Sequence, residues 1–187
     1  MTRAYAYMGA RSESSLTPEF RKFMPLFAAL DGPILDAPCG YGRHALSLHE
    51  LGCRMTCADI DDQALEQLTR FNKRFREAGQ RRLELFKVDL AKGDWPFEEA
   101  QFSGALNVHF YESRLLANIA FSLIAGGLLY VETIENRRGN YLQLPKAGEI
   151  RSLLADTFEF LHLKERHAGP PNSGKVTVRM LARRLVL

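Results

Sequence analysis

Hydrophobic and polar residues follow two kinds of pattern along this chain. Short apolar runs that lead into polar or glycine-rich connections are typical of strands, and apolar residues at three- or four-residue spacing are typical of amphipathic helices. The apolar runs predict strands at Ile34–Asp36 and over residues 53–58, 83–88, 102–108, 128–133, 158–166 and 175–186. The helical spacing predicts helices over residues 17–31, 61–77, 113–123 and 149–155. It also predicts a helix that follows Gly42 and continues through Leu48.

Strands and helices that alternate with short connections predict a parallel, doubly wound sheet. The end of the chain breaks this alternation, because residues 169–174 are a Gly-Pro-Pro-Asn-Ser-Gly connection that is too short for a crossover helix. We therefore predict an α/β fold, a doubly wound, mostly parallel seven-stranded sheet with a C-terminal antiparallel hairpin. The expected organisation is one domain over residues 1–187, made of an arm and helix (1–31), a ligand-binding core (32–134) and a C-terminal loop, helix and hairpin (135–187).

Composition and charge narrow the class of protein. A chain of 187 residues with 46% hydrophobic and 25% charged residues has the size and composition of one globular domain. The net charge of +3 is spread over the chain, so we expect neither nucleic acid nor membrane as a partner, and a monomer or homodimer. The three cysteines, Cys39, Cys53 and Cys57, match no disulfide or zinc pattern, which predicts a cytoplasmic protein without a metal site.

The candidate chemistry begins directly after the first predicted strand. Gly40 and Gly42 would let the backbone approach a ligand closely, and the helix that follows would direct its free N–H groups at that ligand. Residues 40–45 also satisfy the G-x-G-x-x-A dinucleotide pattern, and here both a strand and a helix flank it. This stretch therefore predicts a nucleotide-type cofactor loop. His44, on that helix, is expected to face outward.

Polar residues end the first four predicted strands, where a doubly wound sheet binds its ligands. Asp36, Asp59 and Asp89 end the first three strands, and Asn107 and His109 end the fourth. A carboxylate at Asp36 would repel a pyrophosphate but would attract a sulfonium compound that carries an α-amino group. Asp59 is placed to accept hydrogen bonds from ribose hydroxyls, and Asp89 from an adenine amino group.

These motifs, in this order and spacing, resemble the class I S-adenosylmethionine-dependent methyltransferases from about residue 32 to the end. The stretches that carry the resemblance are residues 36–44, 58–60, 88–90 and 123–133. Small bacterial methyltransferases of the tellurite-resistance and thiopurine types are the most similar subgroup. Pro38 departs from the family pattern, since it stands where the first glycine is usual, and it should stiffen the turn.

The resemblance implies a Rossmann-like methyltransferase fold, with S-adenosylmethionine as cofactor and S-adenosylhomocysteine as product. It also implies a set of cofactor-binding residues at the loop and the strand ends: Asp36, Cys39, Gly40, Gly42, Asp59, Ile60, Asp89, Leu90 and Asn107. No inserted domain or extended basic face is visible, so the expected acceptor is a small molecule. It would be covered by the N-terminal arm, by the residues after the fourth strand and by the loop 135–148.

Methyl transfer from a sulfonium is an in-line displacement, which alignment of the reactants accelerates by proximity. A hydroxyl or amine acceptor would also need a base, and His109 or Glu132 could supply it. Two alternatives remain at this point. The chain could be a NAD(P)-dependent oxidoreductase, as the G-x-G-x-x-A match suggests, or a non-catalytic S-adenosylmethionine-binding module or partner subunit.

Overall fold

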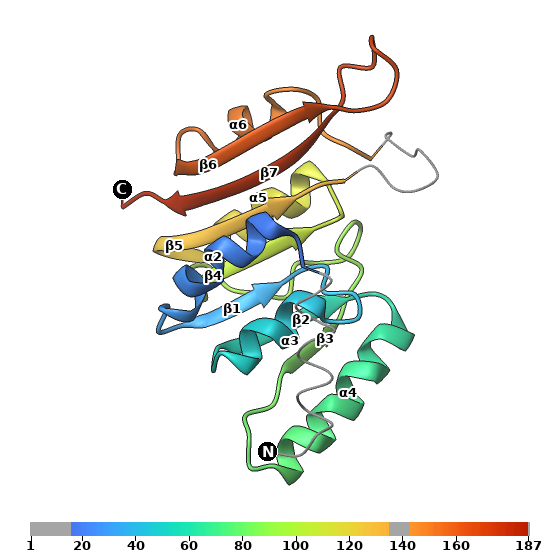
Figure 1. Cartoon of the computed structure of the whole chain (residues 1–187), viewed down its shortest axis with the longest axis vertical. Coiled ribbons are helices and arrows are strands. Elements are labelled where there is room, and N and C mark those ends of the chain that lie inside the picture. Colours follow the sequence, from blue (N-terminus) through green and yellow to red (C-terminus); the bar gives the residue numbers. More distant parts are fainter. Residues whose placement is uncertain (1–15, 135–142, 187) are drawn as a thin grey trace. The chain divides into compact units, whose positions relative to one another are not determined.

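The structure, a computed structural model, describes residues 16–134 and 143–186 (Figure 1). The chain divides into two compact units, residues 1–94 and residues 95–187. The predicted arm over residues 1–15, and residues 135–142 of the predicted covering loop, lie outside the described residues. None of the helices in the described ranges is long and apolar enough to cross a membrane.

The first unit contains three parallel strands with β2 in the middle. Its described strands and helices are α2 (Pro18–Ala28), β1 (Pro33–Asp36), α3 (Arg43–Glu50), β2 (Arg54–Asp59), α4 (Asp62–Glu77) and β3 (Glu84–Lys87). The register places Asp36 beside Cys57, and Asp59 beside Lys87. The carboxyl ends of the three strands therefore lie along one edge, as the sequence predicts.

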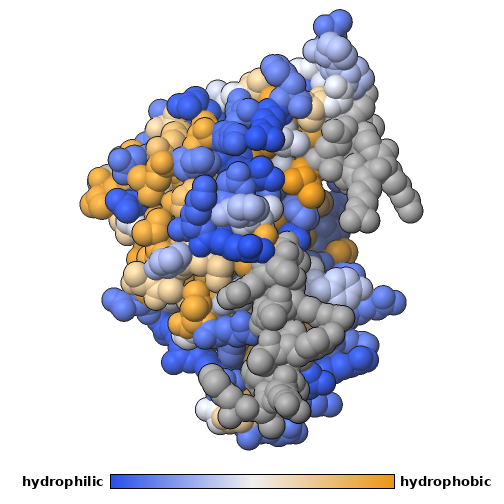
Figure 2. All heavy atoms as spheres, in the orientation of Figure 1, coloured by the Kyte–Doolittle hydropathy of each residue, from blue (hydrophilic) through white to orange (hydrophobic). Residues whose placement is uncertain are grey.

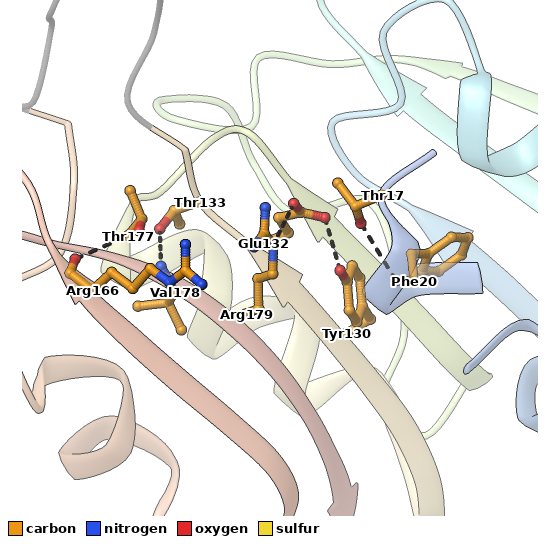
Figure 3. Close-up of polar contacts among 9 residues, drawn as sticks. All are labelled: Thr17, Phe20, Tyr130, Glu132, Thr133, Arg166, Thr177, Val178 and Arg179. Carbon is orange, nitrogen blue, oxygen red and sulfur yellow. Dashed lines mark hydrogen bonds and ion pairs between the residues drawn. The ribbon is translucent and has the colours of Figure 1, made fainter. Parts of the chain in front are cut away.

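Helix α2 begins where the sequence predicts, because Thr17 caps it. The Thr17 side chain accepts a hydrogen bond from the Phe20 N–H at 3.4 Å, and Pro18 takes the first helical position, where a missing N–H costs nothing (Figure 3). Its buried face carries Phe20, Met24 and Phe27. The predicted core-packing helix is thus confirmed, although it ends at Ala28 rather than near residue 31.

The prediction for His44 is wrong. Its side chain is buried, 4% exposed, and its ring meets the Phe20 ring edge-on with 4.8 Å between the centroids. The outward assignment came from the spacing of α3 alone. Helix α2 packs against α3 and covers the side on which His44 lies, and spacing within one helix does not report such a neighbour.

The second unit has strands in the order β4-β5-β7-β6. Its described strands and helices are β4 (Phe102–Val108), α5 (Ser113–Phe121), β5 (Leu123–Glu132), α6 (Glu149–Leu154), β6 (Phe158–His167) and β7 (Val176–Arg184). Strands β4 and β5 are parallel, whereas β7 is antiparallel to both β5 and β6. These pairings confirm parallel strands followed by a C-terminal antiparallel hairpin.

Strand β5 begins five residues earlier than predicted. The predicted strand starts at Leu128 and would leave residues 124–127 as a turn, but Leu123 already pairs with Phe102. The register then shifts, so that Gly104 pairs with Leu128. Gly126 has φ +78°, a conformation that glycine adopts without steric cost. The Gly126-Gly127 pair is therefore an irregularity within the strand rather than a turn before it.

The two ends of these strands carry different kinds of side chain. Exposed apolar side chains lie near the amino-terminal end of β5 and the carboxyl end of β7, among them Phe121, Ile124, Leu185 and Val186. Figure 2 shows hydrophobic surface on the side where Figure 1 marks the C-terminus. The opposite end of β5 carries two buried polar residues, Glu132 and Thr133.

Candidate active site

Asp36 is a buried carboxyl group with one oxygen left unused. Its side chain is 1% exposed, and Oδ2 accepts a hydrogen bond from the Ala45 N–H of α3 at 3.2 Å. Oδ1 is buried and has no hydrogen-bond partner among the described residues. Burial raises the pKa of Asp36 to about 7, against the lowering effects of the Ala45 N–H and the Arg43 guanidinium. Asp36 is thus placed to accept a hydrogen bond from outside this part of the chain.

The two glycines after β1 are required for different reasons. At Gly40, with φ +50°, a Cβ atom would meet nothing within 4 Å, so the loop leaves open space there. At Gly42, with φ +75°, a Cβ atom would lie 2.4 Å from Leu68 Cδ2 on α4. Gly42 therefore allows the loop to pack against α4, and Gly40 is the position where a ligand can approach the backbone.

Asp59 fastens this loop to the end of β2. Its Oδ2 accepts a hydrogen bond from the Gly40 N–H at 2.7 Å, and its Oδ1 accepts one from the Asp61 N–H at 3.0 Å. The Cys39 N–H donates to the Ala58 carbonyl at 3.0 Å, which is a second link between the loop and β2. Each carboxylate oxygen has a further lone pair, so Asp59 retains the capacity to accept ligand hydroxyls.

The remaining candidates of the first unit are less enclosed. Asp89 is half-buried, and its Oδ1 accepts hydrogen bonds from the N–H groups of Ala91 and Lys92 at 3.0 and 3.1 Å. Leu90 is 9% exposed and Ile60 is 56% exposed. The Val88 N–H donates to the Asp59 carbonyl at 3.0 Å, which ties these two strand ends together. The edge therefore offers carboxylate acceptors and apolar side chains beside the glycine loop.

In the second unit, the candidates lie at the carboxyl end of β4. Asn107 is 1% exposed, whereas His109 is exposed and has φ +65°, in the left-handed region. The His109 N–H donates to the Glu132 carbonyl at 2.7 Å, which fixes its backbone against the end of β5. His109 is thus presented to solvent from a constrained position.

Glu132, the other candidate base, is fully buried and engaged by its neighbours (Figure 3). Its Oε2 accepts a hydrogen bond from the Tyr130 hydroxyl at 2.8 Å, and its Oε1 accepts one from Arg179 Nε at 3.0 Å, which is also an ion pair. The sequence analysis did not name Arg179 as a site residue. Its position in the predicted strand over residues 175–186 does not indicate that it contacts Glu132. Of the two candidate bases, His109 is therefore the accessible one.

Comparisons with known proteins decide the class. The sequence profile of a family described as "Methyltransferase domain" matches residues 34–127, half of the chain, a span that includes the glycine loop and the first four strands. This chain belongs to the S-adenosylmethionine-dependent methyltransferases. No curated protein sequence matches it significantly.

Solved structures share the fold of this methyltransferase at low sequence identity. A SAM-dependent methyltransferase from Methanosarcina mazei is 19% identical, with a TM-score of 0.66, over 92% of this chain and 99% of the other. An rRNA methylase from Streptococcus thermophilus is 16% identical, with a TM-score of 0.66, over 91% and 99%. A geranyl diphosphate methyltransferase in complex with GPP and sinefungin is 15% identical, with a TM-score of 0.62, over 90% and 77%.

The family and fold confirm several predictions together. The chain has the Rossmann-like methyltransferase fold, and its cofactor is S-adenosylmethionine rather than the nicotinamide cofactor that the G-x-G-x-x-A pattern left open. The site fits this cofactor, because the unused Asp36 oxygen can accept from a cationic amino group and the Asp59 carboxylate can accept from hydroxyls.

Proposed function

We propose that this methyltransferase transfers a methyl group to a small-molecule acceptor. Binding of the cofactor is supported by the unused, fully buried Oδ1 of Asp36, four residues before the open backbone position at Gly40. A buried carboxylate oxygen without a partner costs free energy, so its retention at a ligand-facing strand end favours a bound cation. S-adenosylmethionine supplies a methyl group on a sulfonium, which is reactive toward nucleophiles without further activation.

In this proposal the residues of the first unit bind and orient the cofactor. Asp36 accepts from the α-amino group, and Asp59 accepts from the ribose hydroxyls. Asp89 accepts from the adenine amino group, while Ile60 and Leu90 contact the flat base. The proposed cofactor site of this unit is completed by Cys39, Gly40 and Gly42, and Asn107 of the second unit stays a sequence-based prediction. The protein then contributes mainly alignment, because an in-line displacement depends on the geometry of its reacting atoms.

His109 is the proposed base for a hydroxyl or amine acceptor. Its side chain is exposed at the carboxyl end of β4, where acceptors reach the ligand-binding edge of this fold. An imidazole accepts a proton at neutral pH, whereas Glu132 is already bound to Tyr130 and Arg179. A thiol acceptor would need no base, because its thiolate forms readily near neutral pH.

The small size of the acceptor is supported by charge and by the fold. Lys and Arg total 25 against 22 Asp and Glu, and they form no long basic run of the kind that binds a nucleic acid backbone. Structural neighbours of similar TM-score include both a geranyl diphosphate methyltransferase and an rRNA methylase. The fold therefore does not select the acceptor, and the proposal rests on the charge distribution.

The experiment that tests the proposal measures cofactor binding and then methyl transfer. S-adenosylhomocysteine or S-adenosylmethionine at about 100 times its dissociation constant should raise the thermal midpoint by roughly 5 to 10 °C. A shift with NADPH instead would contradict the cofactor assignment. Labelled methyl should then enter a small-molecule extract and not total RNA. Transfer to RNA would overturn the acceptor class, and binding without any transfer would favour a non-catalytic module.

A further inference from the structure

Three strands of the second unit place charged residues in one row at the carboxyl end of β5, and β4 adds an apolar residue to the row. Val108 on β4 pairs with Glu132 on β5, and Glu132 pairs with Arg179 on β7. Arg179 in turn pairs with Lys164 on β6. The N–H of His109, the residue after Val108, donates to the Glu132 carbonyl. The row thus runs from the proposed base to the edge strand of the hairpin.

Three cations share one face of this hairpin. Residues directly opposite each other in an antiparallel pair lie on the same face, so Arg179 and Lys164 are neighbours. Thr177 and Arg166, two residues further along, are opposite each other on that face as well. We call Lys164, Arg166 and Arg179 the hairpin cations.

The hairpin cations are only partly compensated by negative charge. Arg179 pairs with the buried Glu132. Among the residues that the structure describes, the Lys164 and Arg166 side chains form no ion pair. Like charges placed directly opposite each other, such as Lys164 and Arg179, destabilise a sheet. The charges of Lys164 and Arg166 therefore favour an added anion.

A small pocket lies among these residues. It has a volume of about 20 Å³, room for about one water-sized group, and is lined by the hairpin cations together with Thr133, Ile134, Thr177 and Val178. Pockets that enclose a whole small ligand are typically about 300–1,000 Å³, so this depression can receive one oxygen of a charged group, and the rest of the ligand would lie outside it. The Thr133 hydroxyl accepts from the Val178 N–H at 2.8 Å and retains its own hydrogen to donate (Figure 3).

Glu132 orients Arg179 beside this pocket. The ion pair uses Nε–H of the guanidinium, which carries four further N–H donors. The Tyr130 hydroxyl holds the other Glu132 oxygen, so the carboxylate cannot turn away. A guanidinium fixed in this way suits the planar, two-point binding of a carboxylate or phosphate.

We infer that the hairpin cations bind an anionic group, a carboxylate or phosphate, on the methyl acceptor. The inference rests on the proposed function, since the row begins at His109. It favours a small anion over RNA, because a phosphodiester backbone is bound by a longer series of cations than this pocket provides. Glu132 and Tyr130 are then positioning residues for Arg179.

The test is a titration of the full chain with inorganic phosphate at constant ionic strength. The titration is monitored by ¹H–¹⁵N NMR. Phosphate should shift the Arg179 Nε–H and Thr133 amide signals. The double substitution Lys164→Met with Arg166→Met should raise the dissociation constant at least tenfold. Arg183→Met is the matched control, since Arg183 is exposed on β7 four residues beyond Arg179. Arg183→Met should change the dissociation constant for phosphate less than twofold. Its distance from Arg179, about 13 Å, exceeds the ~8 Å screening length.

S-adenosylhomocysteine affinity, measured on the same samples, separates the two proposals. One outcome is that wild type binds S-adenosylhomocysteine while phosphate fails to shift the Arg179 and Thr133 signals, or shifts them equally in the double variant. Either result would overturn the inference and leave the proposed function standing. Loss of S-adenosylhomocysteine binding in wild type would overturn the proposed function instead. A single-stranded RNA that binds the hairpin cations more tightly than phosphate does would assign them to nucleic acid. Lys164→Gln alone, with an expected threefold or larger loss, replaces the double variant if that fails to fold.

Discussion

Asp36 and Glu132 are two buried carboxyl groups, each at the carboxyl end of a strand, and the chain treats them differently. Glu132 receives the Tyr130 hydroxyl on one oxygen and Arg179 on the other. Asp36 receives only the Ala45 N–H, and its second oxygen has no partner in the described part of the chain. A fully bonded carboxylate organises its neighbours, whereas an incompletely bonded one is held ready for a ligand.

The side chains near the two carboxyl groups also differ in the sign of their charge. The edge of the first unit carries Asp36, Asp59 and Asp89, which suits a cofactor rich in hydrogen-bond donors. The hairpin of the second unit carries cations, which suit an anionic group. The two units thus offer opposite charges to the two proposed reactants.

Removal of the His109 imidazole should have the largest effect on the reaction. His109→Ala is expected to lower turnover by about 10²–10⁴-fold, the range for loss of a general base, with S-adenosylhomocysteine affinity unchanged within twofold. His109→Gly is the matched control, because glycine adopts φ +65° without strain. It should lose the same activity. Full activity in either variant would remove His109 from the mechanism and reopen the case for Glu132.

Breaking the Glu132 ion pair should affect stability. Glu132→Gln keeps the shape but removes the charge opposite the partly exposed Arg179, and loss of this charged hydrogen bond should cost about 2 kcal/mol. For a chain of this length the thermal midpoint should fall by roughly 4 to 8 °C. Glu159→Gln, on an exposed residue of β6, should stay within about 0.5 kcal/mol of wild type. An unchanged thermal midpoint in Glu132→Gln would contradict the structural role of Glu132, and with it the contrast to the ligand-binding role of Asp36.

The same kind of substitution at Asp36 should affect ligand binding instead. Asp36→Asn removes the charge that the cofactor's amino group would meet, and S-adenosylmethionine affinity should fall about 10- to 100-fold, or roughly 1.5–3 kcal/mol. Without ligand, the variant should be at least as stable as wild type at pH 8, because a neutral amide escapes the cost of a buried charge. Calorimetric titration and thermal melting measure the two effects. Wild-type affinity would contradict the role of Asp36.

The last expected effect is a pH dependence that Asp36 confers. Its pKa of about 7 lies above the unfolded value of 3.8, so the folded protein retains this proton when the unfolded chain has lost it. Stability from this group should therefore fall as the pH rises from about 4 to about 7. Cofactor affinity should rise as the pH approaches 7, in total by about the 10- to 100-fold that Asp36→Asn loses, and then level off. The difference between wild type and Asp36→Asn isolates both trends, and a constant difference would contradict them.

The sequence predicted the features that depend on local pattern. The order of strands and helices, the acids at the strand ends and the antiparallel hairpin all follow from residue spacing and from the glycine and proline positions. Helices α2 and α4 also begin where the sequence places them, because Thr17 and Asp61 bond N–H groups within the first turn of each helix. Such features need few contacts from distant parts of the chain.

Features that depend on contacts between distant residues required the tertiary structure. Glu132 and Arg179 are 47 residues apart, and only the register of β5 with β7 brings them together. His44 is buried because α2 covers it, and Gly42 is required because Leu68 lies against it. The sequence by itself determined which chemical groups stand at the strand ends. Packing and strand register decided which of them are satisfied within the chain and which remain available to a ligand.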